Sequence, residues 1–230
     1  MSGAGTRFAS CVDFDFGGTS WRALPQCALL WRSREWLVVA DVHFGKAATF
    51  RARGVPVPRG TTAANLERLS GLIDSSRPRR LVFLGDLLHA RDARHSEAMR
   101  LLAQWRERHR RLAMTLVAGN HDRHAGAPPG TPLEVVEEPW TVDGIAWCHH
   151  PQQHHGASVI AGHLHPCVRL HGAANDTLRL PCFWQRPGLL TLPAFGEFTG
   201  GALIARESGD RVIAVADGRL IEIPSAAGSP

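Results

Sequence analysis

The chain contains 230 residues, 44% of them hydrophobic and 20% charged, which is an ordinary composition for a globular protein. This length suits one α/β domain, so we expect residues 1–224 to form a single domain and residues 225–230 a flexible tail. No apolar run approaches the roughly 20 residues that span a bilayer, and residues 1–10 lack the apolar stretch of a secretory signal. We therefore expect a cytoplasmic protein with no membrane partner.

Charge, cysteine and histidine content narrow the possible functions. The net charge of +5 favours a polyanionic partner, although Lys46 is the only lysine and an arginine bias also arises from genome composition. The 5 cysteines form an odd set without a C-x-x-C pair, which argues against a disulfide framework and a zinc ribbon. The 13 histidines, several of them adjacent or one residue apart, point toward metal binding.

Apolar runs alternate with amphipathic stretches, which is the pattern of an α/β fold with a largely parallel central sheet. Buried strands are predicted at residues 36–40, 81–84, 114–118, 145–148 and 159–161. Covering helices are predicted at residues 61–73 and 94–111. Later apolar segments, separated by Gly, Pro and Asn, predict antiparallel strands of a second packed sheet at residues 168–170, 178–180, 189–192, 202–205 and 212–215.

Polar clusters directly follow the predicted buried strands. They are Asp41-x-His43, Gly85-Asp86, Gly119-Asn120-His121-Asp122, His149-His150 and Gly162-His163-Leu164-His165. At the carboxyl ends of parallel strands, such clusters share one rim and converge on one site. Carboxylate oxygens and neutral imidazoles suit divalent Mn, Fe, Zn or Co, and one carboxylate can bridge two ions. The series therefore predicts a dinuclear metal centre for phosphoryl chemistry.

Each cluster taken alone has a structural alternative. Asp86 could cap a helix, Asn120 could occupy a turn, and His149 could be a satisfied core residue. The cluster ending in His163-Leu164-His165 is the most specific, because two imidazoles one residue apart after a strand have few structural uses. It is the joint occurrence of all the clusters, in this order, that favours the metal interpretation.

The series resembles the calcineurin-like metallophosphoesterase superfamily, and the match covers residues 41–165. The resemblance implies an α/β fold, a metallophosphoesterase-type α/β/β/α sandwich of two packed mixed sheets flanked by helices. It also implies two divalent metal ions, with Mn²⁺ expected first and Fe, Zn or Co as alternatives. The implied ligands are Asp41, His43 and His165 for one ion, Asn120, His149 and His163 for the other, and Asp86 as the bridge. His149 is preferred because the family ligand usually follows its strand directly, and His150 remains the alternative.

Two further histidines receive catalytic roles by resemblance. His121, next to Asn120, matches the position that approaches the substrate phosphate without binding metal, where it would stabilise charge or protonate the leaving oxygen. His89 stands three residues after Asp86, where many phosphatases of the superfamily carry Asp, and this spacing is similar to that of certain DNA nucleases. We expect His89 to contact the scissile phosphate. The alternatives are a plain surface position for His121 and packing beneath the site for His89.

Flanking residues are similar to the bacterial DNA ligase-associated metallophosphoesterases. This resemblance rests on residues 40–46 (ADVHFGK), on Phe50-Arg51 with Gly54 and Pro56, and on residues 192–201 (LPAFGEFTGG). It extends over nearly the whole chain and implies a phosphodiesterase or endonuclease acting in bacterial DNA repair. The implied substrate is DNA, which we expect to be single-stranded, and the implied partners are a DNA ligase and a helicase.

Basic residues after the first metal cluster are candidates for binding phosphates that flank the scissile one. Lys46, Arg51 and Arg53 are the predicted substrate-binding residues, with Arg59 nearby, and a solvated basic edge is the alternative. Phe195 and Phe198 could stack on bases, but a place in the core is favoured. The rival functions are a small-molecule phosphodiesterase, a phosphomonoesterase and a catalytically silent scaffold, and the filled ligand positions argue against the last.

Overall fold

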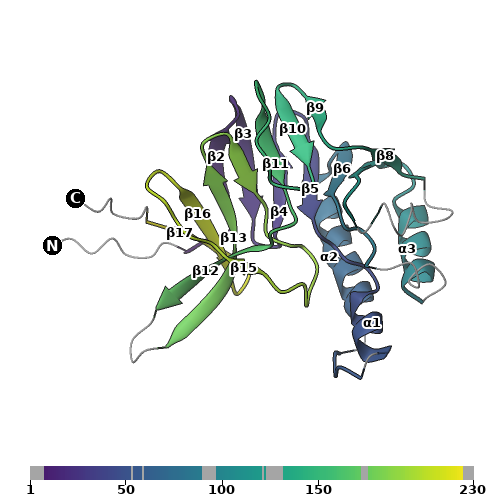
Figure 1. Ribbon diagram of the computed structural model, residues 1–230. Helices are drawn as coiled ribbons and strands as arrows, with labels where there is room; N and C mark the ends of the chain where they lie inside the picture. The colour runs from purple at the N-terminus through teal and green to yellow at the C-terminus, as the bar shows by residue number, and fades with distance from the viewer. Residues whose placement is uncertain are drawn as a thin grey trace.

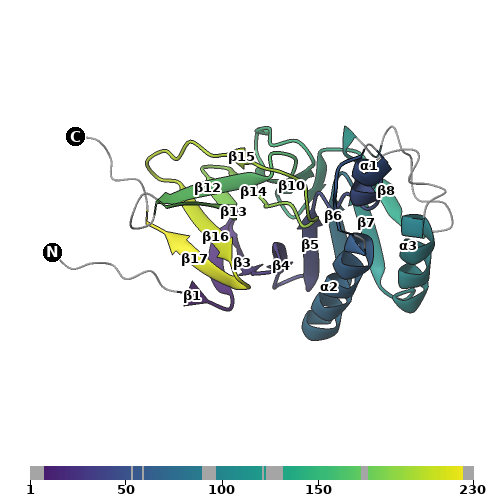
Figure 2. The same ribbon diagram turned by 90° about the horizontal axis from the view of Figure 1, so that it is seen from below.

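The computed structural model describes residues 8–52, 54–58, 60–89, 97–120, 122, 132–171 and 176–224. These residues form two β-sheets stacked face to face, with helices against one outer face of the stack (Figure 1 and Figure 2). The predicted tail at residues 225–230 lies outside the described residues. Within the described part, no helix combines the length and apolarity needed to cross a membrane.

The first sheet is antiparallel from β2 to β5 and parallel from β5 to β8. In spatial order its strands are β2 (Val12–Phe16), β3 (Thr19–Leu24), β4 (Ala28–Trp31), β5 (Trp36–Ala40), β6 (Arg80–Leu84), β7 (Ala113–Val117) and β8 (Glu134–Val136). The predicted strands match β5, β6 and β7 to within one residue at each end. The sequence pattern did not predict the other four strands.

Helices α2 (Thr61–Ser76) and α3 (Glu97–Arg108) cover the outer face of the first sheet and correspond to the two predicted helices. The short α1 (Lys46–Ala52), which follows β5, was not predicted. Side chains alternate along β5, so Leu37 packs with the helices whereas Val38 points into the sandwich. Burial on both faces explains why the parallel strands are continuous apolar runs in the sequence.

The second sheet is also mixed. Its main path is β1 (Phe8–Ala9), β17 (Arg219–Ile223), β16 (Arg211–Ala216), β13 (Thr177–Arg186), β14 (Leu189–Thr191), β11 (Ser158–Ala161), β10 (Ile145–Cys148) and β9 (Trp140–Val142). Off this path, β12 (Pro166–His171) pairs with β13 and with β15 (Ala202–Leu203). The expectation that all the buried strands share one sheet is wrong, because β10 and β11 belong to this second sheet, where β10, β11 and β14 run parallel. Sheet membership depends on contacts distant in the sequence, which an apolar run does not encode.

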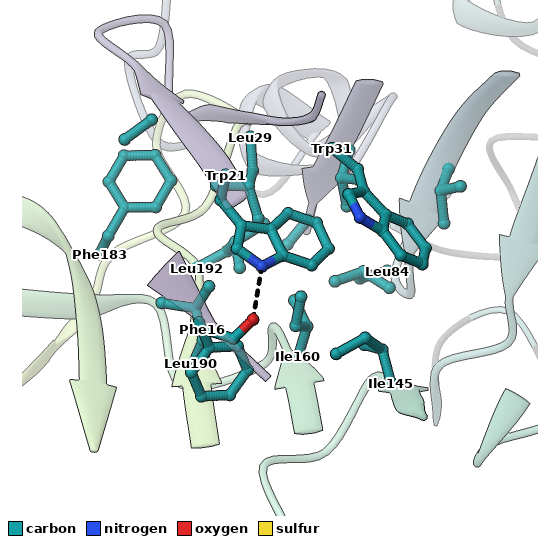
Figure 3. Packing of buried hydrophobic residues seen from close by; sticks show 14 of the residues in the cluster. Phe16, Trp21, Leu29, Trp31, Leu84, Ile145, Ile160, Phe183, Leu190 and Leu192 are labelled. Atoms are coloured by element: carbon teal, nitrogen blue, oxygen red, sulfur yellow. Dashed lines mark hydrogen bonds between the residues drawn. The ribbon is translucent and has the colours of Figure 1, made fainter. Parts of the chain in front are cut away.

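Tryptophan side chains fill the space between the sheets. Trp21 and Trp31 of the first sheet stack with ring centroids 5.0 Å apart, and Trp147 of the second sheet lies 5.8 and 5.4 Å from them. Figure 3 shows Trp21 among buried aliphatic side chains, with its Nε1 donating a hydrogen bond to Phe16 O at 2.9 Å. A buried indole usually has such a partner. This packing holds the two sheets in fixed relative positions.

Backbone hydrogen bonds join the sheets at the carboxyl end of β5. The Phe195 N–H donates to Ala40 O at 2.8 Å, and the Gly196 N–H donates to Asp41 O at 3.1 Å. Residues 194–196 follow β14 of the second sheet, so they hold the exit of that strand against the exit of β5. The strand ends of both sheets therefore meet at one end of the sandwich.

Candidate dinuclear metal centre

The predicted metal ligands meet at this end of the sandwich, although two different sheets supply them. Asp41, Asp86 and Asn120 follow β5, β6 and β7 of the first sheet, while His149 and the pair His163 and His165 follow β10 and β11 of the second. Direct contacts cross between the sheets, because the His163 N–H donates to Asp41 Oδ2 at 2.8 Å. The sequence analysis expected all the ligands at the rim of one sheet, whereas they converge from the facing rims of two sheets.

Most of these residues have a left-handed backbone conformation. Asp41, His43, Asp86, His163 and His165 have φ angles between 47° and 68°, and they are five of the eleven non-glycine residues with positive φ in the described part of the chain. Such conformations cost about 1–3 kcal/mol each and concentrate at functional sites. The backbone therefore marks this cluster as functional independently of its side-chain chemistry.

Asp41, His43 and His165 form the first group of potential ligand atoms. One atom from each of these side chains lies within 4.8 Å of the others, and His165 Nε2 is 3.2 Å from Asp41 Oδ1. The other ring nitrogen of His165, Nδ1, lies 3.1 Å from Thr199 O, to which a protonated Nδ1 donates. A backbone partner of this kind fixes the tautomer that leaves Nε2 available to a metal.

His149 is the centre of the second group. Its Nε2 lies 2.9 Å from Asn120 Oδ1, 3.0 Å from His163 Nδ1 and 3.5 Å from Asp86 Oδ1. Asp86 faces both groups, since its Oδ2 lies 3.7 Å from His43 Nε2. The two carboxylate oxygens of Asp86 are therefore directed toward different ligand groups, which is the arrangement that a bridging carboxylate requires.

The donor atoms fit divalent metal ions in spacing and in chemistry. Two ligands bound at right angles about 2.1 Å from one ion lie about 3 Å apart, and the contacts of His149 with Asn120 and His163 are 2.9 and 3.0 Å. Burial, followed by the charges of His149 and His150, lowers the pKa of His163. A neutral imidazole is the form that binds a metal. The site thus suits divalent ions that accept oxygen and nitrogen ligands.

Glu138 distinguishes His149 from its neighbour His150. Its Oε2 accepts hydrogen bonds from the backbone N–H groups of both histidines at 2.8 and 2.9 Å, and its Oε1 lies 2.7 Å from His150 Nδ1. The His149 side chain is fully buried and faces Asn120 and Asp86. Both histidines lie close enough to His163 to share an ion with it, but the contacts with Asn120 and Asp86 favour His149 as the ligand.

Asp122 is a structural part of the site that the sequence analysis did not identify. It is 5% exposed, and its two oxygens accept hydrogen bonds from Gly119 N at 3.0 Å and Leu87 N at 2.9 Å. Burial raises the pKa of Asp122 to about 6, against the opposing effect of these backbone donors. Asp122 therefore ties the loop that carries Asp86 to the loop that carries Asn120. Its place in the Gly-Asn-His-Asp cluster was the available signal.

The glycines of the motifs are required by close approach. A Cβ added to Gly85, where φ is +69°, would overlap the imidazole of His149. A Cβ on Gly119 would lie 2.6 Å from Asp86 Oδ1, and one on Gly162 would lie 2.6 Å from Asp41 Oδ2. Glycine thus precedes the predicted ligands because the carboxylates and imidazoles occupy the space that a side chain would need.

The structure describes only one of the two predicted catalytic histidines. His121 lies outside the described residues. The His89 N–H donates to Phe44 O at 3.1 Å, and the His89 ring centroid lies 5.6 Å from that of His43. His89 is therefore at the edge of the candidate centre, and its contact with the scissile phosphate stays a prediction.

The predicted substrate-binding residues differ in their position relative to the metal centre. Lys46 is half-buried, and burial lowers its pKa while the charges of Asp41 and Asp86 oppose that shift, so the ammonium lies in the electric field of the centre. Arg51 Nη1 donates to Pro58 O at 2.8 Å and is not held against the ligands, whereas Arg53 and Arg59 lie outside the described residues.

The two aromatic candidates, Phe195 and Phe198, differ in burial. Phe195 is buried beneath α2, where the Arg68 guanidinium lies 4.1 Å from its ring centroid. The core expectation is wrong for Phe198, which is 46% exposed.

A cavity of about 330 Å³ opens beside the first ligand group. His165, Cys167, Arg179, Pro181 and Thr199 contribute to its lining. A larger cavity of about 660 Å³ lies elsewhere, between Arg22, Leu24 and Leu72, and contains none of the predicted ligands. Of these two cavities, the smaller one reaches a predicted ligand.

Comparison with known proteins identifies a matching family and similar solved structures. The family described as Calcineurin-like phosphoesterase matches residues 36–158, more than half of the chain. Among solved structures, the Pseudomonas putida nuclease MPE is 40% identical over 93% of this chain and 100% of that chain, with a TM-score of 0.83. Yfce, a phosphoesterase from E. coli, is 14% identical over 80% of this chain and 90% of that chain, with a TM-score of 0.42. No curated protein sequence matches.

The family match and the similarity to the Pseudomonas putida nuclease confirm the resemblance inferred from the motifs. They also confirm the α/β fold of two packed mixed sheets. Such a fold implies divalent metal ions, for which the Asp and His groups described above are the candidates. The chain belongs to the calcineurin-like phosphoesterase family and is a metal-dependent phosphoesterase.

Proposed function

We propose that the protein is a nuclease that hydrolyses phosphodiester bonds in single-stranded DNA with two divalent ions. The observation that carries the proposal is the position of Asp86, whose two carboxylate oxygens face His43 and His149 in separate ligand groups. A pair of ions clamps the attacking and leaving oxygens of a phosphoryl displacement. The similarity to a Pseudomonas putida nuclease over nearly the full length favours a polynucleotide substrate.

The side chains around the ions have distinct proposed tasks. When bound, the ions lower the pKa of water and neutralise the charge of the phosphate. Thr199 O and Asp122 orient the ligands from outside the coordination shell, since they hold His165 and the loops of Asp86 and Asn120. His121 protonates the leaving oxygen, His89 contacts the scissile phosphate, and Lys46 adds positive charge beside it.

The proposal also names the metal, the cellular role and the residues that bind flanking phosphates. Manganese is the proposed metal, because the ligand set combines imidazoles with the carboxylate oxygens that suit manganese, and metal availability rather than affinity decides occupancy. The motif resemblance supports a role in bacterial DNA repair beside a ligase and a helicase, and the cytoplasm is the proposed location. Arg51 and Arg53 are proposed to bind flanking phosphates.

A small-molecule phosphodiesterase is the second candidate, and the cavity beside His165 favours it. Its volume of about 330 Å³ falls at the lower end of the range for pockets that enclose small ligands. The same metal centre would serve either substrate. The two candidates differ in whether contacts beyond the scissile phosphate contribute to catalysis.

The test compares substrates on one preparation of protein. Metal is removed with EDTA, Mn²⁺, Zn²⁺ or Mg²⁺ is restored, and cleavage is measured on single-stranded DNA, duplex DNA, a chromogenic diester and a chromogenic monoester. We expect cleavage of single-stranded DNA to require added metal and to exceed diester hydrolysis in kcat/KM. Hydrolysis of the diester without any cleavage of DNA would contradict the nuclease proposal and favour the second candidate.

A further inference from the structure

The ribbon formed by β12 and β13 extends from the metal centre and presents two arginines on one face. Arg169 and Arg179 stand directly opposite each other in the antiparallel register. Cys167 and Pro181, two residues nearer to His165, form another opposite pair on the same face, because side chains alternate along a strand. Figure 1 shows the ribbon leaving the same end of the sandwich at which α1 follows β5.

This face of the ribbon is continuous with the cavity beside the metal centre. Cys167, Pro181 and Arg179 all contribute to the lining of the cavity that reaches His165. The opposite face is apolar, since Val168 and Leu180 are buried in a cluster with Trp184 and Val212 of the second sheet. Packing of the apolar face therefore fixes the ribbon so that its arginine-bearing face continues the cavity wall outward.

No ion pair stabilises the two arginines within the described structure. Both side chains are exposed, and no carboxylate in the described part of the chain pairs with either of them. Like charges directly opposite each other on neighbouring strands destabilise a sheet. A guanidinium pair of this kind is suited instead to phosphate oxygens, which it can bind through two parallel N–H donors.

We propose that Arg169 and Arg179 form an exit track that binds the backbone phosphates of the strand leading away from the metal centre on the side of His165. The inference rests on the proposed nuclease function and adds a second binding surface to it. Lys46 and Arg51 belong to α1, after the loop of His43, whereas the track lies on the ribbon that follows His165. A polynucleotide that crosses the centre would contact both surfaces, whereas a small diester in the cavity would reach Arg179 but not Arg169, which is not part of the cavity lining.

The experiment uses the double variant Arg169→Ala/Arg179→Ala, the single variant Arg169→Ala and the matched control Arg111→Ala. Arg111 is also exposed, but it precedes β7, at the end of the first sheet opposite the metal centre. With Mn²⁺-loaded protein, we expect the double variant to raise KM for single-stranded DNA by about tenfold. Arg169→Ala alone should raise KM for DNA by about threefold and change hydrolysis of a chromogenic diester by less than about twofold, because Arg169 is not part of the cavity lining. The control should leave both substrates unaffected.

Binding of a fluorescent single-stranded oligonucleotide in EDTA provides a second readout that needs no cleavage. Each neutralised phosphate of a single strand contributes a slope of about −0.7 to the dependence of log K on log salt, so loss of two contacts should flatten the slope by about 1.4. An unchanged slope and KM would overturn the exit track whether or not the protein cuts DNA. Equal losses on DNA and on the diester in Arg169→Ala would also overturn it, because they would place Arg169 at the reacting phosphate. Wild-type protein that binds DNA through the track but never cuts it would contradict only the nuclease proposal.

Discussion

The α-carbon of Gly85 approaches the imidazole of His149 so closely that a methyl group at position 85 would overlap the ring. Gly85 also has a φ of +69°, so a larger residue would be strained even without the contact. This relationship couples the loop after β6 in the first sheet to the ligand after β10 in the second. The glycine of the Gly-Asp motif is therefore required by a residue 64 positions away in the sequence.

Gly85→Ala should displace His149 and weaken metal binding by about 10- to 100-fold, the usual effect of disturbing the support of a ligand. The matched control is Gly71→Ala in α2, where an added Cβ meets nothing within 4 Å. That change should stabilise the helix by about 0.5–1 kcal/mol. Titration of metal-free protein with Mn²⁺ measures the first effect and urea unfolding the second. Unchanged metal affinity in Gly85→Ala would show that His149 is not a ligand.

Asp122→Ala should lower both the free energy of unfolding and the affinity for metal. Loss of the carboxylate leaves the buried N–H groups of Gly119 and Leu87 without their acceptor, at a cost of about 1–3 kcal/mol for each group. Asp74→Ala removes an exposed carboxylate of α2 and should change the free energy of unfolding by less than about 0.5 kcal/mol. Equal unfolding free energies for the two variants would contradict the role given to Asp122.

His149→Ala and His150→Ala should have opposite consequences for metal content. His149 faces Asn120 and Asp86, so its loss should remove at least one ion, measurable by elemental analysis of the purified variant. His150→Ala should retain both ions, because its Nδ1 is held by Glu138. The reverse result would make His150 the ligand.

His121→Ala should keep both metal ions and lose about 10²-fold or more in turnover, since the residue is proposed to act on the leaving oxygen rather than on the ions. Metal content and turnover on DNA are measured on the same preparation. A variant that loses its ions would instead make His121 a ligand. Activity within a few-fold of the wild type would remove it from the mechanism.

The central strands of the first sheet could be predicted because they are buried on both faces, which gives β5, β6 and β7 continuous apolar sequences. The hairpin of β2 and β3 also left a signal, since Phe14 and Phe16 alternate with polar residues before Gly17-Gly18. The assignment of β10 and β11 to the second sheet could not be predicted. It is determined by pairing with β14, more than twenty-five residues further along the chain, and not by local composition.

The candidate ligands could be predicted because each directly follows an apolar strand, where side chains from distant segments converge. The supporting contacts could not, since the roles of Asp122, Glu138 and Thr199 depend on hydrogen bonds between loops whose relative positions only the fold determines. The arginine pair of the ribbon was missed for the same reason. Arg169 and Arg179 become neighbours only through the register of β12 and β13.

Anomalous diffraction from a crystal of the Mn²⁺-loaded protein tests the dinuclear centre most directly. We expect two manganese peaks about 3.5–4 Å apart. One should lie among Asp41, His43 and His165 and the other among Asn120, His149 and His163, with Asp86 between them. A single peak, or peaks that do not share Asp86, would contradict the proposed centre.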